Sequence, residues 1–285
     1  MADGAARDAE YSRRVAAVFD LVAPGYDLPA LRFFPFAADR LIARINPRRG
    51  EKILDVAAGT GAVALAAAQA VAPDGRVTAI DLAEQMLVQL DAKRRKFGIE
   101  NLDVHVMDAR HLDFRREYFH HTVSSFGIFF LSDMLAGLRE WARVTRLGGT
   151  VTFTVFGAQA FQPMMGLFLS RVQAAGVTFP ENSPRRAAER LQDPEVCRSL
   201  AVEAGLTDVS VEREMIGYHL RDTNDWWEIL WNSGTRAALE QLTPEQQDAL
   251  RTVHDAEVAA LASADGIYLN VETLVVSGRK QAGSR

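Results

Sequence analysis

Apolar and polar residues alternate along this chain with two different periods. Between residues 49 and 157, short apolar runs predict strands. They alternate with segments whose apolar residues recur every three or four positions, as they do on one face of a helix. The predicted strands are Lys52–Val56, Arg76–Ile80, Asp103–Met107, Thr122–Phe126 and Thr150–Phe156, and the predicted helices are Ala62–Ala72, Ala83–Phe97 and Asp133–Thr145. This order predicts a parallel sheet covered by helices on both faces.

Helical patterns dominate the segments on either side of this core. Residues 1–48 form an N-terminal entry segment with predicted helices over Tyr11–Asp20 and Phe36–Ile45, and we expect the first ten residues and the tail GRKQAGSR to be disordered. Further elements are predicted in residues 158–285. They are helices over Pro163–Ala174, Pro194–Ala204, Asn224–Glu240 and Pro244–Ala262, strands over Val209–Met215 and Glu272–Gly278, and loops at PENSPRR and QLTPEQ.

These elements together predict one α/β domain. We expect a Rossmann-like, mostly parallel seven-stranded sheet, with helices on both faces and an antiparallel last strand. Residues 49–157 are its ligand-binding core. The helices of residues 158–285 are expected to complete the same domain as a cap over the carboxyl ends of the strands, because ligands of open α/β sheets bind there.

The first strand and the helix after it carry a ligand-binding signature. ILDVAAGTG ends a strand in a turn with Gly59 and Gly61 one residue apart, and the next strand closes on Asp81. Glycines let a backbone approach a ligand, and an acid at the end of the second strand accepts hydrogen bonds from ribose hydroxyls. Dinucleotides and S-adenosylmethionine both fit this outline.

Asp55 discriminates between these two ligand classes. The turn also satisfies the dinucleotide pattern G-x-G-x-x-A, which keeps an NAD-dependent oxidoreductase as an alternative. A carboxylate four residues before the first glycine would repel a pyrophosphate in a cleft of low dielectric constant. S-adenosylmethionine has no phosphate, and its methionine end carries an ammonium group that a nearby acid favours. Asp108 follows the next strand, so that three acids are expected at one edge of the sheet.

Five segments then resemble the motifs of one enzyme family. ILDVAAGTGAVAL, VTAIDLAEQML, MDARHLDF, SSFGIFFLSD and LREWARVTRLGGTVTF are similar, in order and spacing, to the motifs of class I S-adenosylmethionine-dependent methyltransferases. The resemblance covers about Phe19 to Phe156. Upstream, VFDLVAPGYD resembles the entry segment of the ubiquinone/menaquinone C-methyltransferase branch. The quinone-type and small-molecule methyltransferases are the branches that the chain resembles most.

This resemblance implies a set of cofactor-binding residues. It places the glycine turn under the methionine moiety, one acid at the ribose, and the end of the fourth strand at the ammonium group. The residues concerned are Tyr26, Asp55, Ala57, Gly59, Thr60, Gly61, Asp81, Leu82, Met86, Asp108, Ala109, Ser125 and Phe126. In this set Leu82 and Met86 flank the adenine, Asp108 and Ala109 meet its edge, and Tyr26 closes over the methionine end.

The chain departs from the family pattern at two places. Ala57 stands where the first motif usually has another glycine, and we expect an ordinary turn there. Phe129 and Phe130 stand where the quinone branch has an Arg-Asn pair. These two rings form either an apolar wall for a different acceptor or part of the core.

Methyl transfer makes modest demands on side-chain chemistry. It is an in-line displacement, so that the enzyme's main task is to hold the acceptor close and aligned. A general base is needed only if the acceptor must lose a proton. The sequence leaves the catalytic residue unknown, with His111 as the candidate, and no His/Cys/Asp spacing indicates a metal site. Candidates for an acceptor pocket, or alternatively for the core, are Met164, Met165, Phe168, Trp226, Trp227 and Trp231.

Composition narrows the partners and the compartment. The net charge of −5 argues against a nucleic-acid partner, which usually requires a basic face. The single cysteine gives no disulfide framework, no run of eighteen apolar residues predicts a membrane span, and the acidic start does not resemble a signal peptide. We therefore expect a cytoplasmic protein with a small-molecule partner, and a homodimer is compatible with the sequence.

The sequence thus predicts an S-adenosylmethionine-dependent methyltransferase that moves a methyl group to O, N or C of a small, largely apolar acceptor. One alternative is a quinone-precursor C-methyltransferase. The others are the NAD-dependent oxidoreductase and a non-methylating protein that uses S-adenosylmethionine structurally.

Overall fold

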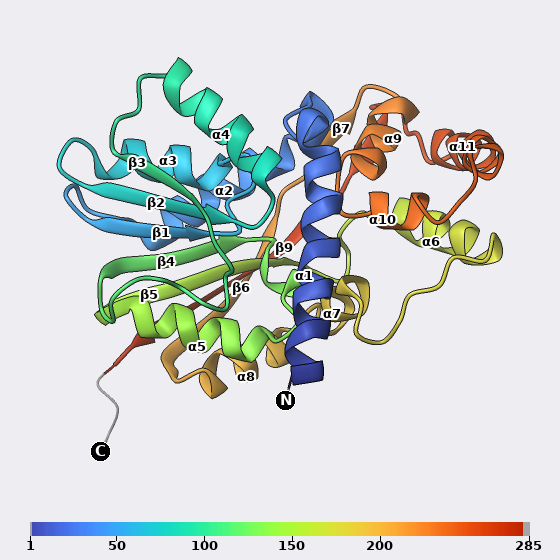
Figure 1. The fold of residues 1–285 in the computed structure, drawn as a ribbon. Helices are drawn as coiled ribbons and strands as arrows, with labels where there is room; N and C mark the ends of the chain where they lie inside the picture. The colour runs from blue at the N-terminus through green and yellow to red at the C-terminus, as the bar shows by residue number, and fades with distance from the viewer. Residues whose placement is uncertain (1, 282–285) are drawn as a thin grey trace.

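A seven-stranded sheet forms the centre of the molecule (Figure 1). The computed structural model describes the backbone of residues 2–281 and the side chains of residues 7–281. The strands follow the order β3-β2-β1-β4-β5-β9-β6 across the sheet. Their bounds are β1 Lys52–Val56, β2 Arg76–Asp81, β3 Leu102–Val106, β4 Phe119–Ser125, β5 Thr145–Phe156, β6 Leu206–Met215 and β9 Glu272–Lys280.

The sheet is parallel except for one strand. Strands β1 to β5 pair in parallel, and β9 lies antiparallel between β5 and β6. The predicted Rossmann-like α/β sheet with an antiparallel last strand is therefore confirmed. In β1, Ile53, Leu54 and Val56 are all fully buried. A strand covered on both faces requires such a continuous apolar run.

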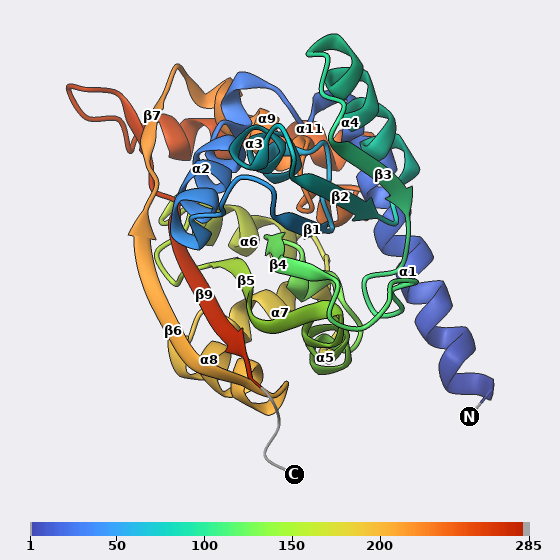
Figure 2. The same cartoon turned by 90° about the vertical axis from the view of Figure 1, so that its left-hand side faces the viewer.

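Helices cover both faces of this sheet (Figure 2). On one face lie α2 (Phe33–Ile45), α3 (Ala62–Val71) and α4 (Glu84–Lys96). On the other lie α5 (Met134–Val144) and α8 (Pro194–Glu203). The small side chains of α3 let its backbone approach β1 and β2 closely, and the helix follows the glycine turn directly.

The N-terminal helix is longer than predicted. Helix α1 spans Ala2–Val22, so the expectation of disorder in the first ten residues is wrong for residues 2–10; residue 1 lies outside the described residues. Two 3-10 turns, η1 (Ala23–Gly25) and η2 (Pro29–Leu31), follow it. Contacts with α4 and α10 support a helix whose sequence has only a weak apolar face. The local sequence pattern does not reveal such contacts, so it gave no sign of the longer helix.

The C-terminal helices gather on the far side of α1 from most of the sheet (Figure 1). They are α6 (Met164–Ala174), α7 (Pro184–Arg190), α9 (Thr223–Trp231), α10 (Arg236–Leu239) and α11 (Pro244–Ala259). A two-stranded sheet of β7 (Tyr218–Leu220) and β8 (Ile267–Leu269) accompanies them.

Four local predictions in this half need correction. Helix α7 begins inside the predicted loop PENSPRR, where Ser183 caps the helix and Pro184 takes its first position, a recognisable start signal. The predicted helix Asn224–Glu240 is broken into α9 and α10, separated by the segment Asn-Ser-Gly-Thr. The β7–β8 pair was missed because two three-residue strands far apart in sequence leave little local pattern. In the tail, residues 278–280 belong to β9 instead of being disordered, whereas 282–285 lie outside the described residues.

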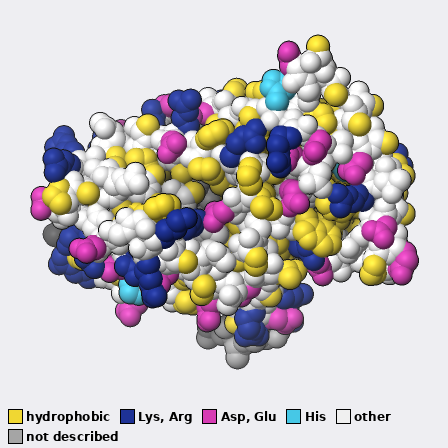
Figure 3. All heavy atoms as spheres, turned by 90° about the horizontal axis from the view of Figure 1, so that it is seen from above, with side chains coloured by type: hydrophobic (Ala, Val, Ile, Leu, Met, Phe, Trp, Pro, Cys, Tyr) yellow, Lys and Arg dark blue, Asp and Glu magenta, His cyan; other side chains and the backbone are white. Residues whose placement is uncertain are grey.

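One face of the molecule carries mixed charges. Viewed from above, Lys and Arg side chains are interspersed with Asp and Glu and with scattered hydrophobic groups (Figure 3). Among residues 2–281, no helix combines the length and the apolar character that crossing a membrane requires.

Candidate functional site

Two neighbouring cavities open at the carboxyl ends of β1, β4 and β5. The first, which we call the glycine-turn cavity, has a volume of about 300 Å³ and is lined by Asp55, the turn after β1, and Ser125 at the end of β4. The second, the aromatic cavity, has a volume of about 420 Å³. Tyr26 and Phe34 line both cavities.

The turn after β1 is built from left-handed backbone conformations. Ala57, Gly59 and Gly61 have φ angles of 55°, 55° and 90°. At Gly61 an added Cβ would lie 2.1 Å from Leu90 Cδ1, so that Leu90 would have to move, and the φ of 90° also favours glycine. The expectation of an ordinary turn at Ala57 is wrong, because an L-residue with a Cβ atom is strained in the left-handed region.

Asp55 is a buried carboxylate without a partner. Its exposed fraction is 1%, and neither carboxylate oxygen has a hydrogen-bond partner among the described residues. Burial and the negative charge of Asp81 raise the pKa of Asp55 well above its ordinary value, and the nearby backbone amide of Ala64 offsets this only in part. A cation brought into the glycine-turn cavity would supply the missing interaction, whereas a phosphate would be repelled.

Asp81 holds the turn in place from the end of β2. Its Oδ2 accepts a hydrogen bond from the Gly59 backbone amide at 2.8 Å, and its Oδ1 accepts one from the Ala83 amide at 2.9 Å. Burial raises the pKa of Asp81, although these amides oppose the shift. The second acid of the sequence signature is thus tied directly to the first glycine.

The entry segment closes over the same turn. Thr60 Oγ1 donates to Asp27 Oδ1 at 2.7 Å, and Lys93 Nζ from α4 lies 2.7 Å from Asp27 Oδ2. Burial and the charges of Asp81 and Asp27 raise the pKa of Tyr26. Sequence reasoning missed Asp27 and Lys93 as lining residues, although Asp27 directly follows Tyr26 in the motif VFDLVAPGYD.

The expected cofactor residues divide into three groups. Tyr26, Asp55, Ala57, Gly59, Thr60 and Ser125 line the glycine-turn cavity. Phe126, which has a φ of 55°, and again Tyr26 line the aromatic cavity. Gly61, Asp81, Leu82, Met86, Asp108 and Ala109 line neither cavity.

The end of α1 and Arg110 cover part of this third group. Met86 is fully buried in a cluster with Val22 and Ala23. The Asp108 carboxylate accepts hydrogen bonds from Arg110, whose guanidinium also reaches Ser12 in α1 at 3.1 Å. The Asp108 pKa is lowered because these hydrogen bonds outweigh the effect of burial.

His111 lies away from both cavities. Its Nδ1 is 3.7 Å from Asp108 Oδ2, and its side chain is 79% exposed. It lines neither cavity, so its catalytic role stays a prediction that the geometry does not support.

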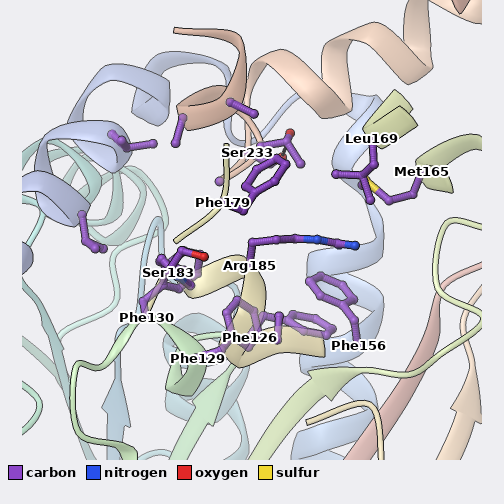
Figure 4. A pocket seen from close by; sticks show the side chains of 18 of the residues that line it. Phe126, Phe129, Phe130, Phe156, Met165, Leu169, Phe179, Ser183, Arg185 and Ser233 are labelled. Carbon is purple, nitrogen blue, oxygen red and sulfur yellow. Dashed lines mark hydrogen bonds between the residues drawn. The ribbon is translucent and has the colours of Figure 1, made fainter. Parts of the chain in front are cut away.

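The aromatic cavity is walled by rings from several elements (Figure 4). Phe126 and Phe156 stack with their centroids 4.2 Å apart, at the ends of β4 and β5. Phe129 and Phe130 both line the cavity, although they also contact the core. Of the other candidates, Met165 and Phe168 line it, whereas Met164, Trp226, Trp227 and Trp231 do not.

The aromatic cavity contains no evident general base. None of the described residues that line it is Asp, Glu, His, Lys or Cys; its titratable groups are Tyr11, Tyr26 and two arginines. Burial raises the pKa of Tyr11 to about 12, and that of Tyr26 is raised further. Neither phenol is therefore ready to accept a proton near neutral pH. Within residues 7–281, no group of three or more His, Cys, Asp or Glu side chains is arranged to hold a metal ion.

Comparison with known proteins agrees with this geometry. Aklanonic acid methyltransferase DauC from Streptomyces sp. (strain C5) is 32% identical over 157 residues, which cover 54% of this chain and 71% of the relative. Nocamycin O-methyltransferase from Saccharothrix syringae is 26% identical, with coverage of 92% and 97%. Demethylmenaquinone methyltransferase from Geobacillus kaustophilus (strain HTA426) is 29% identical, with coverage of 72% and 93%.

A solved structure shares the fold, and a family model covers the site. The YcgJ protein from Bacillus subtilis superposes with a TM-score of 0.57 at 17% identity, over 87% of this chain and 99% of that chain. The model of the ubiE/COQ5 methyltransferase family matches residues 7–170, which include the glycine turn and all three acids. The chain belongs to the ubiE/COQ5 methyltransferase family and is an S-adenosylmethionine-dependent methyltransferase of small molecules.

Proposed function

We propose that the glycine-turn cavity binds the methionine end of S-adenosylmethionine and that the aromatic cavity binds a small, largely apolar acceptor for methylation at O, N or C. The observation that carries this proposal is the sharing of Tyr26 and Phe34 by the two cavities. A donor in one cavity and an acceptor in the other would meet at these rings.

The residues of the glycine-turn cavity fit the methionine end. The unpartnered Asp55 carboxylate matches the ammonium group, and Ser125 lines the same space. We further propose that Asp81 accepts from the ribose hydroxyls, that Leu82 and Met86 flank the adenine, and that Asp108 and Ala109 meet its edge. Since α1 packs against Met86 and Arg110 binds Asp108, the N-terminal helix takes part in closing the adenosine side.

The chain contributes alignment and exclusion of water to the reaction. When bound, S-adenosylmethionine supplies an electrophilic methyl group on a sulfonium. The phenyl rings around the aromatic cavity keep water from competing with the acceptor, and their rigid packing restricts its orientation. Restricting the approach to an in-line geometry accounts for much of the barrier lowering that such a site achieves.

The acceptor is proposed to differ from a quinone precursor. The relatives include enzymes named for aklanonic acid, nocamycin and demethylmenaquinone, all of them low-molecular-weight compounds. Phe129 and Phe130 replace the polar pair of the quinone branch and line the cavity wall. Quinone-precursor C-methylation, supported by the demethylmenaquinone relatives, remains the second candidate.

We also propose that the enzyme acts in the cytoplasm and has no nucleic-acid substrate. The net charge of −5 and the mixed charges of the face in Figure 3 support this proposal, because nucleic-acid binding relies on a basic surface. A homodimer stays a prediction from the sequence.

Labelled methyl transfer into phenols, carboxylic acids, amines and quinone precursors tests the proposed function. We expect transfer to at least one apolar ring compound. Leu169→Trp, which fills part of the aromatic cavity, should abolish this transfer while S-adenosylhomocysteine still binds. The control Leu147→Trp places the same side chain at a position that is 48% exposed, and it should change neither. Equal methyl transfer by both variants would show that the acceptor does not bind in the aromatic cavity.

A further inference from the structure

We infer that the acceptor binds as an anion, with its acidic group paired to Arg185 of α7, and that it is methylated without a general base. This inference rests on the proposed function, because it names the substrate class of the aromatic cavity. The acceptor class is an apolar ring compound with an ionised oxygen function, such as a carboxylate, an enolate or an acidic phenolate.

Arg185 extends into the aromatic cavity. In Figure 4 its side chain lies between Phe179 on one side and Phe126 and Phe156 on the other, with Met165 and Leu169 near its end. Its side chain is 29% exposed, so that the rings shield it substantially from solvent. A charge–charge interaction in such surroundings is stronger than one on an open surface.

The positive charge of α7 is only partly neutralised within the protein. Arg185 Nη2 lies 2.8 Å from Glu189 Oε1, but Arg186 Nη1 lies 2.9 Å from Oε2 of the same carboxylate. Glu189 therefore serves both guanidinium groups, and a second carboxylate, Glu181, lies 3.9 Å from Arg186 Nε. Arg186 does not line the cavity, whereas Arg185 does.

The other charged side chain that lines the aromatic cavity is also positive. Besides Arg185 the lining includes Arg14 of α1, whose Nη2 lies 3.3 Å from Glu10 Oε1, and the described lining residues include no acid. The charged side chains among these lining residues are thus all arginines, in a chain whose net charge is −5. Planar guanidinium groups pair well with carboxylates and similar oxyanions. An anionic acceptor complements this charge, and a cationic amine does not.

The absence of a general base among the described lining residues also favours an acceptor that binds as an anion. An acceptor that arrives ionised already holds the electron pair that it needs. That pair forms the bond to the methyl carbon while the carbon–sulfur bond breaks and its electrons stay on sulfur. The sulfonium charge and the acceptor charge disappear together, and no proton has to be removed.

A pair of matched probes tests the inference by binding. With S-adenosylhomocysteine saturating, calorimetry measures the affinity for 1-hydroxy-2-naphthoic acid and for its uncharged analogue 1-hydroxy-2-naphthamide. We expect the wild-type enzyme to prefer the acid by about tenfold or more, because the charge-assisted pair is lost with the amide. Arg185→Gln should bring the two affinities close together, while Arg185→Lys keeps part of the preference.

Arg186→Gln is the matched control. It removes the neighbouring guanidinium that shares Glu189 but does not line the cavity, so the preference for the acid should remain. Unchanged S-adenosylhomocysteine affinity and thermal unfolding would show that both variants are folded.

The outcomes separate this inference from the proposed function. If the wild type binds acid and amide equally, or if Arg185→Gln keeps the preference, the anionic acceptor is wrong and the aromatic cavity remains the acceptor site. If neither probe binds and no ring compound accepts a labelled methyl group, the proposed function fails and this inference fails with it.

Discussion

The rings of Tyr26 and Phe34 stack with their centroids 4.6 Å apart and an angle of 19° between their planes. Both side chains line the glycine-turn cavity and the aromatic cavity. Tyr26 comes from the entry segment and Phe34 from the first turn of α2. The meeting point of the two cavities is therefore built by residues that precede the sheet in sequence.

Replacing Phe34 by alanine should slow methyl transfer by about 10- to 100-fold, because a loosely held acceptor rarely reaches the in-line geometry. S-adenosylhomocysteine affinity should fall by a smaller factor, because Phe34 is only one of the residues that line the glycine-turn cavity. Single-turnover transfer and calorimetry measure the two quantities separately. Phe97→Ala, at a position that is 61% exposed, is the control, and an equal loss of rate in both variants would contradict this role of Phe34.

Asp55→Asn should raise the stability of the ligand-free enzyme and weaken cofactor binding. The buried carboxylate has no partner without a ligand, so its removal relieves a desolvation cost. The loss of a charge-assisted interaction should lower the affinity for S-adenosylhomocysteine by roughly 10- to 100-fold. Thermal unfolding measures the expected gain in stability, and calorimetry measures the expected loss of affinity. Asp81→Asn is the contrast, since Asp81 already accepts two backbone hydrogen bonds and its loss should destabilise the turn.

S-adenosylhomocysteine binding should release a proton in mildly acidic solution. The pKa of Asp55 is raised well above 3.8 in the free enzyme, and an ammonium group beside it lowers that pKa in the complex. The free enzyme then holds more protons than the complex, so affinity increases as the pH rises through the range above 3.8. Calorimetry in buffers of different ionisation enthalpy measures the proton. If Asp55→Asn still releases a proton on binding S-adenosylhomocysteine, the proton comes from another group.

Ala57→Gly should stabilise the protein by about 1 kcal/mol. Glycine adopts the left-handed conformation at this position without the steric cost that a Cβ atom imposes. Ala58→Gly is the control: this neighbour is outside the left-handed region, so glycine there should destabilise by roughly 0.5–1 kcal/mol. Denaturant unfolding measures both, and a loss of stability in Ala57→Gly would show that the strain is not significant.

Acid should weaken the packing of the C-terminal helices through His254. Trp226 Nε1 donates to His254 Nε2 at 2.8 Å, which requires a neutral imidazole, and burial lowers the pKa of His254 below 6.5. The unfolded chain then binds more protons than the folded one just below pH 6.5, so the free energy of unfolding falls as the pH decreases through this window. His254→Gln should reduce the slope of stability against pH, measured by denaturant unfolding.

Much of the glycine-turn cavity was predictable from local sequence. The strand, the turn with Gly59 and Gly61, and the acids Asp55 and Asp81 lie within one contiguous βαβ unit. Such a unit places its ligand-binding groups through short-range geometry. Ala57 is the exception: its left-handed conformation was not expected, although the glycine that the motif usually has at this position is a signal for it.

The aromatic cavity was largely hidden from the sequence. Arg185 belongs to the segment PENSPRR, whose pattern predicts a loop. The sequence does not separate a core role from a cavity-wall role for Phe129 and Phe130, because an aromatic side chain shows the same pattern in both. Asp27 and Lys93 were missed since their link to Thr60 joins three separate elements.

By itself, the sequence determined the sheet, its glycine turn and the family of the enzyme, because periodicity and short motifs report on neighbours along the chain. Only the tertiary structure decided that the end of α1 packs against Met86, that two cavities meet at Tyr26 and Phe34, and that the side chain of Arg185 enters an aromatic cavity. These features join residues that lie far apart in sequence, and their positions follow from packing that no local pattern records.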